Sequence, residues 1–330
     1  MFIVVCVVFF IATTAHAQQT SDYEPDTSEI FNTERTITTP HHYDVVPGTD
    51  AWRALKNAPE KRAACYVSAE EASRMTTPAL IQTILDYPLI IDAYAYDNHM
   101  IGMDAVSTYF PCIDELVARN DATEQLGQYL QEDDGTNPLI ALHLDTLMKY
   151  ITCRNNTSEN AEGSMRMYTT TVYTPKGSPV TAFVNMTYAD HSTDDPNELP
   201  MTYARALSLH YAYLSAYNII SVLAGVNAAY NCHAYAWYSQ TSTTYCIAEP
   251  DPYIDDASYV ASTCAAGRKV TYQHSSSYYD HSGIVDTATS SYSTTKIISK
   301  WGVAGLYKHY ANDCPYYKSN TTISWWRLNP

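Results

Sequence analysis

The sequence predicts an α+β protein in which a helical N-terminal part precedes a C-terminal part of short antiparallel strands. From about residue 50 to 150, apolar residues recur with the spacing of helices. Between Met165 and Tyr188 the spacing changes to every second residue, which is typical of strands. Further along, a helix that begins near Cys232 is followed by several short strand patterns, so we expect a helix packed on a sheet.

Residues 1–17 have the features of a signal peptide. An apolar run from Phe2 to Ile11 leads to Ala15-His16-Ala17, the small-residue pattern of a cleavage site. We therefore expect a secreted protein with no membrane contact after signal cleavage. Residues 18–40 are polar and rich in Thr without periodicity, which predicts a disordered mature N-terminus.

The charge balance of the chain limits the classes of partner that the protein can bind. The chain has 35 acidic residues against 19 basic ones, and the basic residues are scattered. This balance argues against nucleic acid and against anionic lipid as partners. Neither a glycine-rich phosphate loop nor an H-E-x-x-H motif is present in the sequence, so we expect no cofactor and no metal.

Residues 41–153 are predicted to form a helical domain. Ser68 and Glu71 have the spacing of a capping box, and Thr77 followed by Pro78 predicts an N-cap and the first residue of a helix. This region contains no cluster of catalytic residue types. We interpret it as a scaffold or a binding module.

Residues 154–200 are predicted to hold a β-hairpin and an acidic connecting loop. Two alternating segments, 168–174 and 180–186, flank a turn that is rich in Pro and Gly. An acidic loop follows at 190–198. Apolar spacing then predicts a long helix from about residue 202 to 229.

Residues 201–330 are predicted to carry the chemistry. Asn231 is a strong N-cap type, which indicates a helix that starts there and runs through Tyr238. After it come strand patterns at residues 269–272, 282–285, 296–299 and 323–328.

Cys232 and His281 are the candidate catalytic pair. A thiol becomes a nucleophile when it is held as thiolate, and both a helix start and a neighbouring imidazole favour that charge. Cys232 stands at the predicted helix start, and His281 leads the strand His-Ser-Gly-Ile-Val. A His at the start of a central strand, facing that Cys, would form a thiol–imidazole pair.

The cysteine count supports a reactive thiol. The chain has eight cysteines, and Cys6 lies in the signal peptide, so the mature chain keeps an odd number. Exported chains oxidise their cysteines in pairs, which predicts disulfide bonds and one cysteine left over. The alternative for Cys232 is a disulfide, most simply to Cys246 across a short loop.

The C-terminal third resembles the papain-like cysteine amidases, a superfamily that includes the NlpC-type and CHAP domains. The resemblance covers about residues 228–330 and rests on a Cys at a helix start, then a Gly-led strand, then His-small-Gly-Ile-Val. The motif YNCHAYAWY at 230–238, with SKWG at 299–302, is similar to a group of secreted bacterial proteins. Their N-terminal region also resembles VPGTDAW at 46–52 and MTTPAL at 75–80.

The superfamily resemblance implies roles for individual residues. Cys232 would be the nucleophile and His281 the general base. The residue that orients the imidazole would come from the next strand, which points to Ser299, with His309 as the alternative. The substrate implied is a peptide or a cell-wall peptide. This chain departs from the common pattern at Arg268, where an Asp is frequent after the Gly.

The sequence therefore predicts a secreted cysteine hydrolase that cleaves an amide bond through an acyl-thioester on Cys232. The alternative is a catalytically inactive protein on the same papain-like frame, which binds a peptide or glycan on Tyr-rich surfaces; the chain has 30 Tyr residues. A transferase would use the same thioester with a different acceptor.

Overall fold

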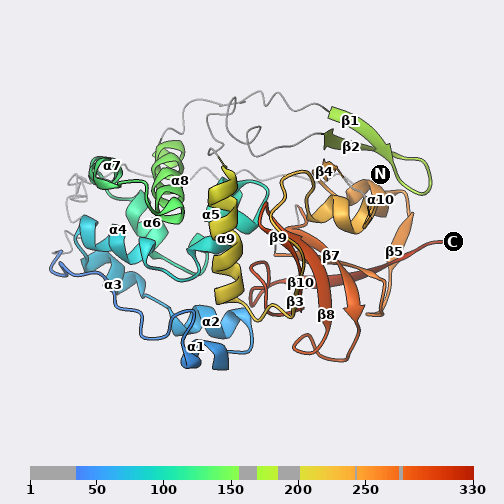
Figure 1. The fold of residues 1–330 in the computed structure, drawn as a ribbon, viewed down its shortest axis with the longest axis horizontal. Helices are drawn as coiled ribbons and strands as arrows, with labels where there is room; N and C mark the ends of the chain where they lie inside the picture. Colours follow the sequence, from blue (N-terminus) through green and yellow to red (C-terminus); the bar gives the residue numbers. More distant parts are fainter. Residues whose placement is uncertain (1–34, 156–168, 185–200, 242–243, 275–277) are drawn as a thin grey trace, which may run out of the picture. The chain divides into compact units, whose positions relative to one another are not determined.

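A computed structural model describes residues 35–155, 169–184, 201–241, 244–274 and 278–330. It confirms the mixed α+β fold, with helices in the N-terminal part and antiparallel sheets in the C-terminal part (Figure 1). The predicted signal peptide and the acidic loop at 190–198 lie outside the described residues. The chain is already ordered at Ile37, within the segment expected to be disordered, because Ile37 forms a parallel bridge with Met75.

The N-terminal part consists of short helices, as predicted. They are α1 (Asp50–Ala54), α2 (Ala58–Ala64), α3 (Ala69–Arg74), α4 (Thr77–Leu85), the 3-10 helix η1 (Ile90–Ala95), α5 (His99–Ser107), α6 (Cys112–Val117), α7 (Ala122–Glu132) and α8 (Pro138–Asn155). Ser68 Oγ accepts a hydrogen bond from the Glu71 N–H at 3.1 Å, so the predicted cap of α3 is confirmed. The prediction that Thr77 caps the next helix is wrong by one residue, because the N-cap of α4 is Thr76, and Thr77 and Pro78 are its first helical residues.

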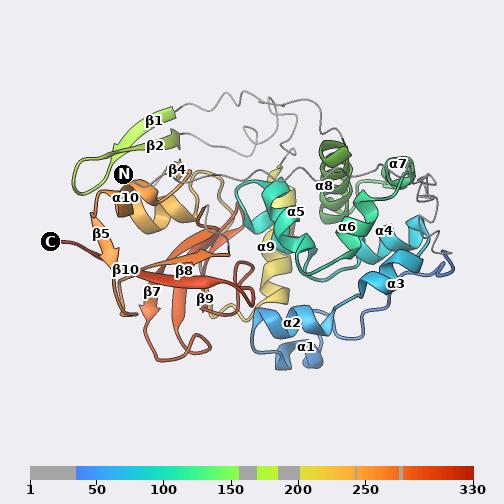
Figure 2. The same cartoon turned by 180° about the vertical axis from the view of Figure 1, so that it is seen from behind.

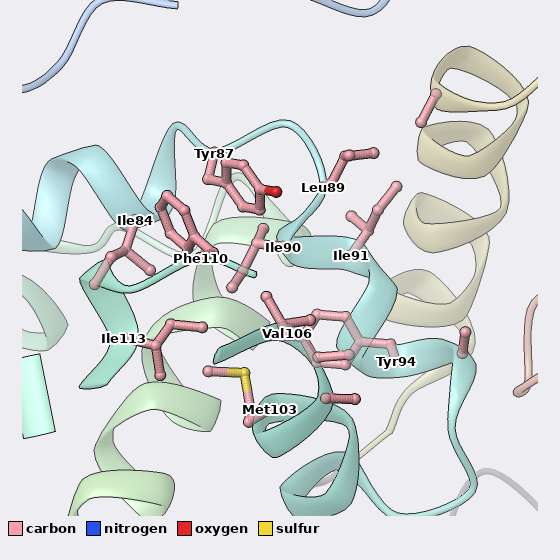
Figure 3. Close-up of a cluster of buried hydrophobic side chains, with 14 of the residues drawn as sticks. Ile84, Tyr87, Leu89, Ile90, Ile91, Tyr94, Met103, Val106, Phe110 and Ile113 are labelled. Carbon is pink, nitrogen blue, oxygen red and sulfur yellow. The ribbon is translucent and has the colours of Figure 1, made fainter. Parts of the chain in front are cut away.

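Apolar side chains from α4, η1, α5 and α6 pack together in the helical part (Figure 3). The ring of Tyr87 stacks on Phe110 with centroids 3.8 Å apart. Ile84, Val106 and Phe110 are all fully buried. Each such side chain contributes about 1.5–3 kcal/mol by leaving water, so this cluster fixes η1 in place.

Helix α2 is tied to the C-terminal end of the chain by buried cations. Lys61 Nζ lies 2.6 Å from Asp313 Oδ1, and both side chains are almost fully buried. Arg62 pairs with Asp92 at 3.0 Å and donates to the carbonyls of Pro315 and Tyr317. Removing one partner of such a buried pair leaves an uncompensated charge, which is strongly destabilising.

Helix α9 (Tyr203–Ala216) lies between the N-terminal helices and the large sheet in both views (Figures 1 and 2). Tyr213 connects the two sides. Its hydroxyl donates to the Ile91 carbonyl at 2.8 Å, and its ring meets that of Trp301 edge-on.

The prediction of one helix over residues 202–229 is wrong beyond Ala216. The chain continues as strand β3 (Ser221–Ala224), which pairs with β9 (Gly305–Tyr310). Three β-branched residues lie just before or within this strand, and such residues favour strands over helices. They are Ile219, Ile220 and Val222.

The predicted hairpin is confirmed as β1 (Thr169–Tyr173) and β2 (Pro179–Val184). A third strand, β4 (Tyr245–Ile247), pairs with β2, so the order of this sheet is β1-β2-β4. Strand β4 follows the Cys232 helix in the chain and connects the small sheet to it.

The second sheet has seven described strands in the order β3-β9-β8-β7-β6-β10-β5, all antiparallel to their neighbours. The predicted strands are confirmed as β6 (Lys269–Gln273), β7 (His281–Thr287), β8 (Lys296–Trp301) and β10 (Thr322–Leu328). The short helix α10 (Asp251–Asp255) and strand β5 (Tyr259–Ala261) were not predicted. Strand β7, which begins with His281, is central in this order.

The two faces of the large sheet carry different cores, because successive side chains of a strand point to opposite sides. Ser282 accepts a hydrogen bond from Trp237 at 2.8 Å, so it faces the π-helix η2 (Ala234–Tyr238). Its neighbour His281 points to the other face, where its ring stacks on Tyr316. That face packs against the helical part.

Gly283 permits strands β7 and β8 to approach. A Cβ at this position would lie 2.7 Å from Ile297 Cγ2 and 3.1 Å from Ser299 Cβ. Gly302, with a φ of +44°, similarly lets the turn after β8 pack on the helical part, since a Cβ there would lie 2.3 Å from the Tyr94 carbonyl oxygen.

All described residues belong to one compact unit, Arg35–Pro330. The domain boundaries drawn from the sequence stay predictions. Within the described ranges, no helix is long and apolar enough to cross a membrane.

Candidate functional site

The side chain of Asn231 fixes the helix that carries Cys232. Asn231 Oδ1 accepts from the Ala234 N–H at 3.0 Å, which is the contact of an N-cap residue. The same amide accepts from the Ile247 N–H at 3.1 Å and donates to the Ile247 carbonyl at 2.8 Å. Cys232 therefore begins a capped helical turn that is fastened to β4.

Cys232 is buried, with 6% of its surface exposed. Burial raises the pKa of its thiol well above the ordinary value, and the nearby Asp97 carboxylate raises it further. Two backbone N–H groups, of Ser282 and His233, bond to the sulfur and lower the pKa in part. The sulfur thus lies beside the first residues of β7, and its resting form is the neutral thiol.

His281 is fully buried, and neither of its ring nitrogens has a hydrogen-bond partner among the described residues. Burial holds the pKa of His281 well below its usual range, and His309 and His233 lower it further. Its resting form is therefore the neutral imidazole. Leaving a buried polar group unpaired costs about 1–3 kcal/mol, so a pair of unsatisfied nitrogens in a sheet core calls for a functional explanation.

The structure brings Cys232 and His281 to one place without joining them. Cys232 bonds to the N–H of Ser282, the residue after His281, and it lies within electrostatic range of Tyr316, which stacks on His281. The imidazole points to the face opposite η2, so it does not face the helix as predicted. No hydrogen bond links the sulfur to the ring in this arrangement, since both ring nitrogens are unpaired within the described chain.

Ser299 is bonded to His309 and not to His281. His309 Nδ1 lies 2.8 Å from the Tyr310 carbonyl, which can only accept, so Nδ1 carries the hydrogen and Nε2 accepts. The Ser299 hydroxyl donates to that Nε2 at 2.8 Å, while its oxygen accepts from Trp301 Nε1 at 3.0 Å. Burial lowers the pKa of His309 to about 4, which agrees with this neutral tautomer.

Lys300 is a fully buried cation next to the thiol. Burial lowers its pKa to about 8, while Cys246, Asp97 and Cys232 act on it in the opposite direction. Its ammonium donates to the Gly302 carbonyl and lies 5.4 Å from the centre of the Tyr230 ring. A cation in this place favours the thiolate over the thiol when the proton leaves Cys232.

No disulfide joins any of the seven cysteines in the described part of the chain. Cys246 is within electrostatic range of Cys232, but the two are not bonded, so the alternative assignment of Cys232 to a disulfide is not seen. The expected pairing of the other cysteines stays a prediction.

Among the described residues, no group of three or more His, Cys, Asp or Glu side chains is placed to hold a metal ion. Comparison of the chain with protein-family models, with curated proteins and with solved structures found no match.

The helical part contributes residues that sequence reasoning did not assign to the site. Asp97, which follows η1, accepts from Asn231 Nδ2 at 2.6 Å. Tyr96 lies against Tyr316, with ring centroids 5.2 Å apart. The sequence carried no local signal for these residues, because they reach the thiol through contacts between distant segments. Lys300 lies in the SKWG motif at 299–302, but the sequence did not indicate a role for it in the site.

Proposed function

We propose that this protein is a thiol hydrolase that cleaves an amide bond of a peptide, with Cys232 as nucleophile and His281 as general base. The observation that carries the proposal is the buried imidazole of His281, whose two nitrogens have no partner in the described part of the chain. The next residue, Ser282, supplies the N–H that contacts the Cys232 sulfur. A neutral imidazole in this state can accept the thiol proton. The resemblance to papain-like amidases supports the same assignment.

The chemistry follows from these groups. An unpaired nitrogen of His281 takes the proton of Cys232, and the sulfur attacks the carbonyl carbon of the amide. The C–N bond then breaks, the imidazolium gives its proton to the leaving amine, and an acyl-thioester remains on Cys232. Water, deprotonated by His281, attacks the thioester; the acid leaves, and the proton returns to the sulfur.

Three groups stabilise the charge that forms during this transfer. The N–H groups of Ser282 and His233 bond to the sulfur, and the Lys300 ammonium lies within electrostatic range of it. Burial makes the Cys232 thiolate and the His281 imidazolium costly to form. This ion pair therefore forms only because the three groups offset the hydration that the two charges lose.

We assign Ser299 a positioning role through His309. A proton on His309 would place a positive charge near His281 and lower its pKa further. The Ser299 hydroxyl donates to His309 Nε2 and so disfavours that proton. Ser299 thereby helps His281 to act as a base without contacting it.

Alkylation of the folded, unreduced protein by iodoacetamide tests the assignment. Cys232 should be labelled faster than the buried Cys65 and Cys112, and the reaction should slow in H281A. H143A is the matched control, because His143 is an equally buried histidine of the helical part and its pKa is lowered to about 3. Equal labelling of Cys232 in wild type and H281A would exclude His281 as its base.

A second candidate function is peptide or glycan binding without catalysis on the same frame. The burial of Cys232 and its raised pKa favour this alternative, because a resting thiol is a poor nucleophile. It predicts that Cys232 resists alkylation at every pH at which the protein stays folded.

A further inference from the structure

Beside His281 lies a group of buried polar atoms that no hydrogen bond satisfies within the described residues. The rings connect them to the thiol site: His281 stacks on Tyr316, and Tyr316 lies against Tyr96. The atoms in question are Lys318 Nζ, Tyr96 Oη, Arg62 Nε and Asp280 Oδ1. Three of the four are donors, which sets this group apart from an acidic cluster.

Of these four groups, Lys318 lacks the most hydrogen bonds. The residue is 6% exposed, and its ammonium has three N–H donors and no acceptor in the described chain. It lies 5.8 Å from the centre of the Tyr96 ring. Burial lowers its pKa to about 8, so it still carries a positive charge at neutral pH.

Tyr96 and Arg62 lie near the Lys318 ammonium. The Tyr96 hydroxyl is buried and has no partner among the residues that the structure describes, although tyrosine hydroxyls in protein cores usually find one. The Arg62 guanidinium acts electrostatically on both Tyr96 and Lys318. The Asp92 carboxylate, which pairs with Arg62, also accepts hydrogen bonds from the hydroxyls of Tyr109 and Tyr217.

Asp280 does not neutralise Lys318 by direct contact. Its Oδ2 accepts from the His274 N–H at 2.9 Å and lies 2.5 Å from His274 Nδ1, while Oδ1 is unpaired within the described residues. Asp280 attracts Lys318 through space without a hydrogen bond to it. The ammonium therefore lies near the site, and none of its donors has an acceptor among the described residues.

We propose that Lys318 and Tyr96 bind a carboxylate group of the substrate next to the scissile bond. This inference rests on the proposed hydrolase function, because it defines the substrate class of the same site. A carboxylate offers about four lone-pair sites, which match an ammonium and a hydroxyl donor together. A neutral amide in the same place would leave the buried ammonium without a hydrogen-bonded counter-charge, since Asp280 acts on it only through space.

Binding can be tested separately from catalysis. The full-length C232S protein would be titrated with N-acetylated dipeptides and with the matching dipeptide amides, and binding would be followed by saturation-transfer NMR. Dipeptides that carry the acid only at the C-terminus or only on a side chain would distinguish the two sources of the carboxylate. K269M is the matched control, because Lys269 is also buried with a pKa lowered to about 8, and its ammonium lies over Tyr259 instead.

We expect acids to bind at least about tenfold more tightly than the matching amides, since hydrogen bonds to a charged group are worth more than neutral ones. K318M should remove this preference, Y96F should weaken it, and K269M should retain it. The comparison in C232S itself needs no variant of Lys318, so misfolding of K318M cannot decide the result. The inference is overturned if acids and amides behave alike or if K318M keeps the preference. Failure of the hydrolase proposal would appear separately, as unchanged alkylation of Cys232 in H281A.

Discussion

The ring of Tyr316 lies flat on the imidazole of His281, with centroids 3.6 Å apart and planes inclined by 5°. The Tyr316 hydroxyl donates to the Ala95 carbonyl, which anchors the ring to the end of η1. One aromatic residue therefore sets the orientation of the proposed base and links it to the helical part. The face of the imidazole is covered, and only its edge nitrogens remain for chemistry.

Tyr316 variants should separate stacking from hydrogen bonding. Y316F keeps the ring and loses one hydrogen bond, so it should cost about 1 kcal/mol of stability and leave Cys232 alkylation unchanged. Y316A leaves a cavity beside His281, which should cost about 3–5 kcal/mol and alter the pH dependence of alkylation. Urea unfolding and the alkylation profile measure the two effects. Equal loss in both variants would show that the hydroxyl, and not the ring, matters.

Replacing Ser299 should change the base through His309. In S299A the His309 Nε2 loses its donor and takes up a proton more readily, so the pKa of His281 should fall further. Alkylation of Cys232 should then slow at acidic pH relative to wild type. S299T restores the hydroxyl and should restore the profile. A profile in S299A identical to that of wild type would argue against this positioning role.

Acid should destabilise the protein through its buried histidines. The pKa values of His233 and His309 are lowered to about 4, against 6.5 for an unperturbed side chain. Between these values the unfolded chain binds more protons than the folded one, so stability falls as the pH drops from 6.5 towards 4. Each histidine should contribute on the order of 3 kcal/mol when the drop is complete.

Urea unfolding at several pH values measures this loss. H309Q should reduce the pH dependence, because it removes one of the titrating groups. The exposed His42 provides the control, and H42Q should leave the dependence as it is. A wild-type stability that stays constant from pH 6.5 to 4 would contradict the assignment of neutral, buried imidazoles.

Gly283 should not accept a side chain. In G283A the new Cβ would meet Ile297 and Ser299 inside the sheet, which should cost about 1–3 kcal/mol and disturb the start of β7. The control is G127A in helix α7, where a Cβ meets nothing within 4 Å. That substitution should stabilise the protein by about 0.5–1 kcal/mol, because Ala is the better helix former. Unfolding by urea compares the two variants; a neutral G283A would show that the strands can separate there.

The sequence predicted the elements that have strong local periodicity. The hairpin stands where alternation and its Pro- and Gly-rich turn placed it, and the strands β6, β7, β8 and β10 stand where short strand patterns were found. It failed for β3, because the apolar spacing of the preceding helix continues past Ala216 and hides the change of period. The three-residue strands β4 and β5 are too short to show a pattern.

The same limit applies to the site. Asn231 predicted its helix start because Asn is a preferred N-cap residue, and its side chain makes the N-cap hydrogen bond to Ala234. The partner of Ser299 could not be predicted, since it depends on the register between β8 and β9, which brings His309 to it. Tyr96 and Lys318 are far apart in the chain, and only the tertiary fold brings them together.

The buried pair between Lys61 and Asp313 also bears on the order of events when the chain is synthesised. Asp313 follows Lys61 by 252 residues in the chain, so the ammonium leaves the ribosome long before its counter-ion. Until Asp313 emerges, the ammonium keeps its hydration, because burying it alone would be costly. Helix α2 can therefore dock in its final position only after Asp313 has been synthesised.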